Sequence, residues 1–126
     1  MTNYGDFYHC EICGQVVTIA LAGSSSLTCC GQQMNLLEAK TSGAGEEKHI
    51  PVIVPDGQST IIKVGEVPHV MTSEHYISFI EVVTKDGKIG RAKLTDVPEA
   101  VFNIKANEIT QVYEYCNLHG LWITTQ

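Results

Sequence analysis

The sequence predicts a mainly β protein, in which a small domain held together by four cysteines precedes a β-sandwich of immunoglobulin-like architecture. Three observations support this prediction. Four of the five cysteines fall within the first 30 residues, short apolar segments of alternating character fill most of the rest, and Gly, Pro, Asp or Asn separates these segments. We place the boundary near residue 37, so that the predicted domains cover residues 1–37 and 38–126.

The first domain contains two cysteine pairs, Cys10-x-x-Cys13 and Cys29-Cys30. Between the pairs, residues 17–21 alternate between apolar and polar as in a strand, and a Gly-Ser turn follows, so we expect a short hairpin. So few apolar residues cannot form a core of their own. Metal binding, however, can supply on the order of 10 kcal/mol of folding free energy to a small cysteine-rich unit. A metal is therefore the expected centre of this domain.

Four thiolates in a tetrahedron suit either iron or zinc. A structural zinc ribbon usually presents two Cys-x-x-Cys knuckles, whereas the second pair here, Cys29 and Cys30, is adjacent. The spacing alone leaves iron and zinc open. A vicinal disulfide and unliganded thiols are the remaining alternatives.

The second domain begins after a stretch, residues 39–47, whose Gly, Ser and Glu content is typical of a linker or loop. Short strands are expected beyond it, with a tight hairpin turn at Asp86-Gly87 and no long helix. Seven short strands favour a β-sandwich. The strand candidates are residues 52–54, 59–64, 76–84, 89–94, 100–106, 109–115 and 121–124.

Charge and hydropathy exclude several classes of partner. The formal net charge is -6, and no cluster of Lys and Arg could neutralise a row of phosphates, so nucleic acid is not an expected partner. No segment has the length and apolar character of a signal peptide or a membrane span, so we expect a cytoplasmic protein without a membrane partner. Five cysteines in such a chain favour reduced, metal-binding thiolates over disulfides.

Five further side chains form a second candidate metal site. Any one of these histidines alone is more typical of the surface or the core, but together they make a borderline ligand set able to hold Fe(II). Five ligands leave the sixth octahedral position free, and a ferrous site with one thiolate has a net charge near +1, which attracts a small anion. The candidate ligands are His49, His69, His75, Cys116 and His119.

Three segments, residues 46–52, 69–76 and 116–122, resemble in order and spacing the signatures of desulfoferrodoxins and neelaredoxins. Together with the four early cysteines, they make the chain similar to the two-iron desulfoferrodoxin branch from about residue 8 to residue 122. One departure is Val70, where the family commonly has proline after the ligand histidine. Here Pro68 precedes that histidine instead, which removes no ligand.

The resemblance implies a rubredoxin-like iron centre bound by Cys10, Cys13, Cys29 and Cys30. It also implies a square-pyramidal iron with the four histidines equatorial and Cys116 axial. The implied activity is that of a superoxide reductase, which reduces superoxide by one electron to hydrogen peroxide without forming dioxygen. Glu47 would bind the oxidised iron, and Lys48 would steer superoxide and organise a proton-donating water. A rubredoxin-like electron donor and a homodimer are expected on the same basis.

Two other functions are compatible with the residues themselves. In the first, both metals only carry electrons, and the protein is an electron-transfer protein without catalytic turnover. In the second, zinc stabilises a β-sandwich that binds another protein. Metal content and visible absorption separate the zinc protein from the iron proteins, and superoxide consumption separates the enzyme from the electron carrier.

Overall fold

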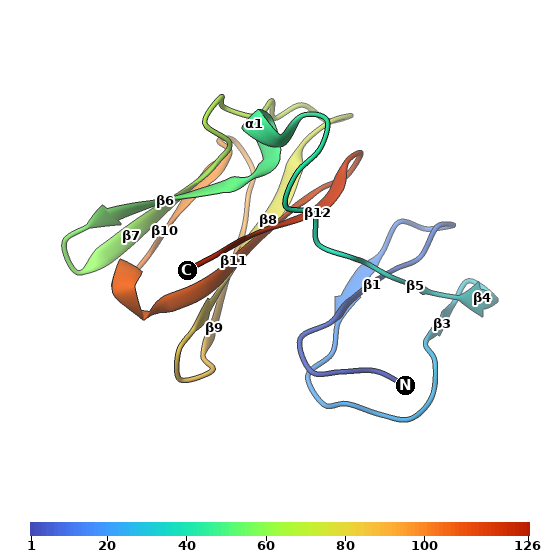
Figure 1. The fold of residues 1–126 in the computed structure, drawn as a ribbon. Helices are drawn as coiled ribbons and strands as arrows, with labels where there is room; N and C mark the ends of the chain where they lie inside the picture. The colour runs from blue at the N-terminus through green and yellow to red at the C-terminus, as the bar shows by residue number, and fades with distance from the viewer. The chain divides into compact units, whose positions relative to one another are not determined.

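The structure is a computed structural model that describes residues 1–126. Its chain divides into two units, Met1–Glu38 and Ala39–Gln126, each with its own sheets (Figure 1). Strands dominate both units, and the only helices are α1 (Glu46–His49) and the 3-10 helix η1 (Ala106–Glu108). The prediction of a mainly β chain is confirmed. Neither helix has the length or the apolar character needed to cross a lipid bilayer.

The first unit is built from five very short strands around a minimal core. Three of them form an antiparallel sheet in the order β2-β1-β5, and the other two form the hairpin β3-β4. The buried cluster consists of Tyr8, Cys10 and Met34, with four partly buried neighbours. Because this core is so small, we expect most of the stability of the unit to come from the cysteine site described below. The strands are β1 (Phe7–His9), β2 (Val16–Thr18), β3 (Thr28–Cys29), β4 (Gln32–Gln33) and β5 (Asn35–Leu36).

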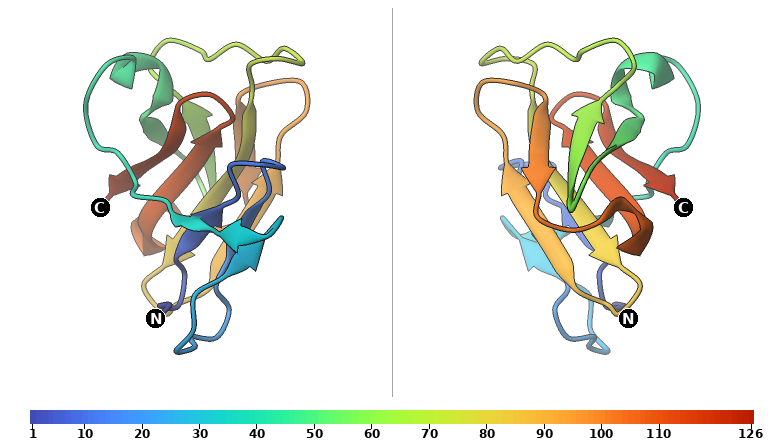
Figure 2. Two further views of the ribbon diagram at one scale, coloured as in Figure 1. Left: turned by 90° about the vertical axis from the view of Figure 1, so that its right-hand side faces the viewer. Right: turned by 90° about the vertical axis from the view of Figure 1, so that its left-hand side faces the viewer.

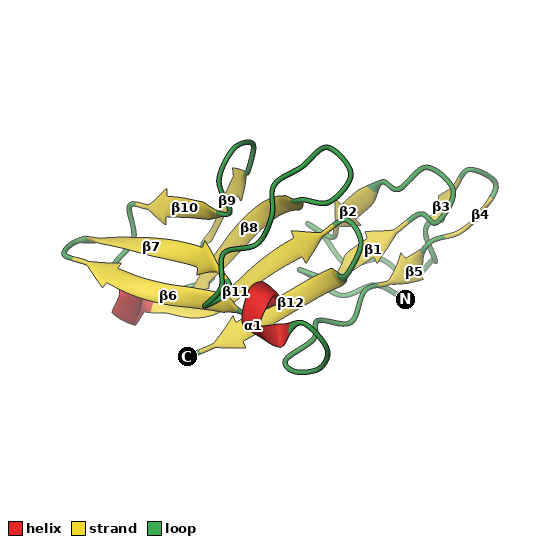
Figure 3. Cartoon of the chain, turned by 90° about the horizontal axis from the view of Figure 1, so that it is seen from above, coloured by secondary structure: helices red, strands yellow, loops and turns green.

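The second unit is a sandwich of two antiparallel sheets, whose labelled strands Figure 3 shows from above. One sheet has the order β10-β7-β6 and the other the order β12-β11-β8-β9. Seven strands in two sheets agree with the predicted immunoglobulin-like sandwich. The strands are β6 (Pro51–Asp56), β7 (Ser59–Val64), β8 (Ile77–Thr84), β9 (Ile89–Lys93), β10 (Glu99–Phe102), β11 (Ile109–Cys116) and β12 (Gly120–Thr125).

The core of the sandwich lies between the two sheets, because alternate residues of each strand face inward. Ile62 and Val64 of β7 meet Ile80 and Val82 of β8 in one buried cluster. Cys116, the last residue of β11, belongs to the same cluster and is fully buried. The apolar core therefore reaches the end of the sandwich at which the candidate ligands lie.

The predicted strand over residues 100–106 is wrong in its second half. β10 ends at Phe102, which is the last residue paired with β7, opposite Thr60. Beyond it the Thr60 hydroxyl donates a hydrogen bond of 2.7 Å to the Ile104 carbonyl, and η1 follows. The alternation of apolar and polar residues continues beyond Phe102, where no partner strand is available. The strand predicted from this alternation is therefore too long.

The predicted linker, residues 39–47, is only partly irregular. Lys40 forms an isolated parallel bridge with Trp122 of β12, in which the Lys40 amide donates to the Leu121 carbonyl and the Ile123 amide donates to the Lys40 carbonyl. The segment then ends in α1, which begins after Gly45. The chain is thus fixed to β12 before it reaches the helix that carries His49.

Candidate metal centres

Five of the candidate ligand side chains converge at one end of the sandwich. Their ligand atoms all lie within 4.8 Å of one another. They come from three segments, namely α1, the loop between β7 and β8, and the end of β11 with the turn into β12. Figure 2 shows these segments at the same end of the unit. The five residues are His49, His69, His75, Cys116 and His119.

Hydrogen bonds from outside the cluster orient two of the imidazole rings. His49 Nδ1 donates to the Gly45 carbonyl at 2.8 Å, and His69 Nδ1 donates to the Val70 carbonyl at 2.6 Å. Because the protonated nitrogen in each ring is Nδ1, the lone pair lies on Nε2. The Nε2 atoms of His49 and His75 are buried without any hydrogen-bond partner.

Cys116 Sγ contacts two of the imidazole rings. It is 3.6 Å from His69 Nε2 and 3.7 Å from His119 Nδ1. The atoms available to a metal are therefore Nε2 of three histidines, Nδ1 of His119 and the Cys116 sulfur. Buried nitrogens without a partner are costly in an empty apolar site, whereas a bound cation satisfies them. The residues present fit a transition metal such as iron.

A single glycine allows α1 to approach the loop that carries His69. Gly65 has φ +85°, and a Cβ at this position would lie 2.6 Å from backbone atoms of Lys48 and from the Val67 carbonyl. One backbone bond joins the same two segments, since the Val67 amide donates to the Glu47 carbonyl, and a second bond, from the His69 amide to the Val64 carbonyl, ties the loop to the end of β7. Only glycine fits this contact, so Gly65 brings His49 and His69 together.

Burial keeps the site in the protonation states that a metal requires of its histidines. It lowers the pKa of His49 and of His69 below the ordinary value, which favours the neutral imidazole. Burial also raises the pKa of the Cys116 thiol, against the lowering effect of hydrogen bonds from the Leu118 and His119 backbone. A nearby cation would reverse that shift, because it stabilises the thiolate.

A pocket of about 420 Å³ opens over the histidines. Four of the five candidate ligands line it, and Cys116 does not, so the pocket lies on the imidazole side of the cluster. Glu47 and Lys48 also line it, and Lys48 is the only cationic side chain that does. Val70, the departure noted in the sequence, lines the pocket too. A small ligand can reach the histidines from this side.

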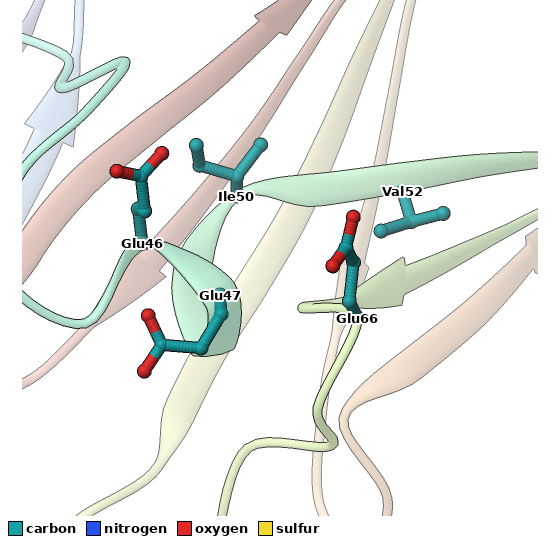
Figure 4. A pocket seen from close by; sticks show the side chains of 5 residues that line it. All are labelled: Glu46, Glu47, Ile50, Val52 and Glu66. Atoms are coloured by element: carbon teal, nitrogen blue, oxygen red, sulfur yellow. The ribbon is translucent and has the colours of Figure 1, made fainter.

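A second hollow next to α1 is acidic (Figure 4). Glu46, Glu47 and Glu66 line it together with the apolar side chains of Ile50 and Val52. Glu47 lines both this hollow and the pocket over the histidines. The electrostatic field is therefore negative on this side of the site, and Lys48 is the only cationic side chain that lines the pocket over the histidines.

Two residues with contacts at the site have no role in the sequence-based prediction. The Trp122 indole stacks on the His49 ring and donates from Nε1 to the His119 carbonyl at 3.1 Å. Lys40 Nζ donates to the same carbonyl at 2.9 Å and lies 5.3 Å from the centroid of the Trp122 ring. Trp122 lies within a quoted signature segment, but no local pattern connects Lys40 with a turn 79 residues away.

The second set of ligands lies in the first unit. Its four sulfur atoms are within 4.8 Å of one another, and all four thiols are free. Two adjacent cysteines can point at one ion because Cys30 has φ +54°, which makes it the only non-glycine residue with positive φ. Cys29 Sγ lies 3.7 Å from Cys13 Sγ and 3.9 Å from Cys30 Sγ.

The four thiols cannot all ionise by themselves. A backbone hydrogen bond from Cys13 is the main cause that lowers the pKa of Cys10 to about 6. The side-chain hydrogen bond with Cys10 is the main cause that raises the pKa of Cys29 to about 12, and the pKa of Cys30 is also raised, chiefly by its hydrogen bond with Cys13. A set of four thiolates at this spacing therefore requires a cation, in agreement with a metal site.

Comparisons with known proteins agree with both halves of the structure. The family model described as desulfoferrodoxin matches residues 41–125, and that described as the desulfoferrodoxin N-terminal domain matches residues 2–37. A desulfoferrodoxin homolog from Archaeoglobus fulgidus is 44% identical over 97% of this chain and 98% of its own. The desulfoferrodoxin of Nitratidesulfovibrio vulgaris is 42% identical over 97% of each chain.

Solved structures give the same result. The superoxide reductase from Treponema pallidum superposes with a TM-score of 0.78 at 31% identity, covering 95% of this chain and 96% of its own. A reduced superoxide reductase (neelaredoxin) from Archaeoglobus fulgidus gives 0.56 at 32% identity, covering 70% of this chain and 95% of its own.

The fold and the two ligand clusters define a two-unit β protein with one four-cysteine site and one site of four histidines and a cysteine. Family models together match both units, and full-length relatives exceed 40% identity. The chain belongs to the desulfoferrodoxin family.

Proposed function

We propose that the protein is a superoxide reductase that reduces superoxide by one electron to hydrogen peroxide. The observation that carries this proposal is the cluster of four histidines and Cys116 beneath an open pocket lined by Lys48. The overall change balances, since one superoxide, one electron and two protons give one hydrogen peroxide. The structural similarity to proteins named superoxide reductase supports the same activity.

The residues that would hold the iron are His49, His69, His75 and His119, which line the pocket, and Cys116, which does not. Iron bound in this way would supply the electron at the coordination position that five ligands leave open. The fully buried thiol of Cys116 excludes water from its side of the centre. The pocket, by contrast, admits a small anion and the water that delivers protons.

Lys48 is proposed to attract superoxide into this pocket. The chain has a net charge of -6, and three carboxylates lie beside the site, so an anionic substrate is otherwise repelled. A single ammonium group at the mouth creates a local attraction that acts on the association rate. Lys48 is also proposed to hold a proton-donating water in the pocket, next to the superoxide.

Glu47 is proposed to bind the oxidised iron after turnover. Its side chain lines both the pocket over the histidines and the neighbouring acidic hollow, so it is exposed and next to the open position. A carboxylate that enters the coordination sphere would stabilise the ferric state, since a hard anionic oxygen suits the more highly charged ion.

The first unit is proposed to hold a second iron through Cys10, Cys13, Cys29 and Cys30. We assign the rubredoxin-like domain to residues 1–37 and the reductase domain to residues 38–126. The spacing of the four sulfur atoms and the matched family domains, residues 2–37 and 41–125, support this assignment. Under this proposal each chain carries two iron centres.

The proposal extends to the setting of the protein. A rubredoxin-like protein is the proposed electron donor, because the reaction consumes one electron per superoxide. A homodimer is the proposed assembly, and the cytoplasm is the proposed location, where free thiols are kept reduced. A detoxifying role follows from removal of superoxide without release of dioxygen.

Product analysis of the iron-loaded, reduced protein tests the function. We expect two irons per chain and one hydrogen peroxide per superoxide consumed, with no dioxygen formed. An electron-transfer protein without turnover is the second candidate, but the open pocket over the histidines favours the enzyme, since a pure electron carrier needs no ligand access. Iron at both sites without peroxide formation would favour the carrier.

A further inference from the structure

His75 differs from the other candidate histidines in how its ring is held. The His49 and His69 rings each donate a hydrogen bond to a carbonyl, and the His119 carbonyl accepts two hydrogen bonds next to its ring. The structure has no hydrogen bond to the His75 ring, whose Nε2 is buried and unpaired. The position of this ring therefore depends on the backbone that carries it.

That backbone forms a tight turn closed by Thr72. The Thr72 hydroxyl accepts a hydrogen bond from the His75 amide at 3.0 Å and donates one to the His75 carbonyl at 3.1 Å. The Thr72 amide donates to the same carbonyl at 2.9 Å. These bonds set the shape of the turn, but they join it only to itself.

The side chain of Asn117 connects this turn to the segment that carries the other ligands. Asn117 Oδ1 accepts a hydrogen bond from the Tyr76 amide at 2.9 Å, and Asn117 Nδ2 donates to the Glu74 carbonyl at 2.9 Å. The two hydrogen bonds hold the backbone immediately before and immediately after His75. The Asn117 amide adds a third bond, to the Tyr76 carbonyl at 3.2 Å.

We infer that Asn117 is a positioning residue that holds His75 in the ligand cluster. The inference rests on the proposed metal centre, of which His75 is one ligand. Asn117 follows Cys116 directly and precedes His119 by two residues, so its side-chain amide ties the backbone around His75 to the segment that carries these two ligands. The ring contacts of His75 agree with this role. The His75 ring meets the His69 and His119 rings edge to face, at centroid distances of 4.5 and 5.0 Å.

Removal of the amide should loosen one ligand rather than unfold the sandwich. Asn117→Ala loses both side-chain bonds and keeps the backbone bond to Tyr76. Loss of an outer partner that orients a metal ligand typically lowers metal affinity 10–100-fold. We expect a loss of this size at the histidine site and none at the four-cysteine site of the same chain.

The test is a titration of the metal-free, full-length protein with Co(II) in the presence of a competing chelator. Trp122 is the single tryptophan and stacks on His49, so its fluorescence reports occupancy of the histidine site. Visible absorption of tetrahedral cobalt reports the four-cysteine site. Asn103→Ala is the matched control, because Asn103 is exposed and lines a pocket that contains no candidate ligand.

Asn117→Asp provides an intermediate case. Aspartate still accepts the Tyr76 amide but cannot donate to the Glu74 carbonyl, so its loss of Co(II) affinity should lie between those of the parent and Asn117→Ala. If Asn117→Ala does not fold, the Asp variant alone decides the matter. Affinity for Co(II) equal to that of the parent in the folded variant would overturn the inference.

A double-mutant cycle with His75→Ala separates positioning of His75 from a general effect on the turn. If Asn117 acts through His75, then Asn117→Ala should change the Co(II) affinity little once His75 is absent. An undiminished effect in that background would overturn the inference. Failure of the parent itself to bind Co(II) at the histidine site would instead refute the proposed metal centre.

Discussion

The indole ring of Trp122 lies nearly parallel to the imidazole of His49, with centroids 5.0 Å apart and an interplanar angle of 16°. Its Nε1 reaches the carbonyl of His119, so one buried side chain contacts two candidate ligands that are 70 residues apart in the chain. Trp122 therefore packs directly against the ligands of the proposed metal centre.

Trp122→Phe should therefore weaken metal binding at the histidine site. Phenylalanine keeps an aromatic face against His49 but cannot donate to the His119 carbonyl, which retains only the bond from Lys40. We expect a loss of roughly 10-fold in affinity for Fe(II), the lower end for an outer-sphere partner. Chelator competition followed by iron analysis measures it. Unchanged affinity would mean that stacking alone orients the ligands.

Cys116→Ser should abolish the reductase activity and leave the four-cysteine site intact. An oxygen ligand is a poorer electron donor than a thiolate at the buried position of the centre. The visible spectrum of the first site serves as an internal control in the same sample. Normal peroxide production by this variant would remove Cys116 from the mechanism.

Lys48→Ile should slow the reaction of superoxide with the reduced protein by about 10-fold or more, because electrostatic guidance is removed. Added salt should slow the parent and affect the variant less, since screening weakens an attraction that the variant has already lost. Pulse radiolysis at several salt concentrations gives both rates. Lys85→Ile, in the β8–β9 turn, is the matched control for loss of one positive charge. Equal rates and equal salt slopes would assign Lys48 to the solvated surface.

Glu47→Ala should leave the encounter with superoxide nearly unchanged but alter the ferric absorption spectrum. The reason is that its carboxylate is proposed to bind only after oxidation. Glu66→Ala removes a carboxylate from the same acidic hollow, outside the histidine pocket, and serves as the control. A ferric spectrum identical to that of the parent would contradict the assignment.

Glu114 should make the metal-free second unit less stable as the pH rises. Its carboxyl is fully buried with neither oxygen paired, and burial raises its pKa from 4.5 to about 9. Between these values the folded state keeps a proton that the unfolded state releases, so stability falls with increasing pH. His49 and His69 act in the opposite sense, but only below their ordinary pKa of 6.5.

Within the second unit, the window from pH 7 to 8.5 lies above the ordinary pKa of His49 and His69 and below the ordinary pKa of the Cys116 thiol, so the effect of Glu114 dominates there. In it, the urea midpoint of the parent, followed by Trp122 fluorescence, should decline, and Glu114→Gln should flatten the decline. A parallel decline in both proteins would assign the effect to another group.

The sequence predicts the strands best where a partner strand matches the alternation. The candidate at residues 59–64 agrees with β7, and the turn at Asp86-Gly87 joins β8 to β9 as expected. The error at residues 103–106 arises because alternation reports an apolar face and not the presence of a neighbouring strand. The two ligand sets cluster as the signatures imply, and metal binding by each residue stays a prediction.

The supporting residues escaped prediction for a physical reason. Lys40, Asn117 and Gly65 act through backbone carbonyls, amides or close approach, and such contacts are set by tertiary structure. A histidine or cysteine is conspicuous by residue type. In the sequence, Asn117 cannot be distinguished from any other polar loop residue, because its hydrogen bonds to the turn that carries His75 become visible only in the fold.

The left-handed backbone at Cys30 has a consequence for how the first site gains and loses its metal. A non-glycine residue in this conformation costs on the order of 1–2 kcal/mol of conformational free energy. Without a cation, only contacts with the neighbouring thiols offset this cost. The peptide should then relax toward ordinary φ, carrying one ligand away from the other three. Capture of a metal at this site would include a backbone rotation as its last step. Slow, conformationally gated exchange is thus expected at the cysteine centre. No ligand of the histidine centre has a left-handed backbone, so that centre should exchange its metal without such a rotation.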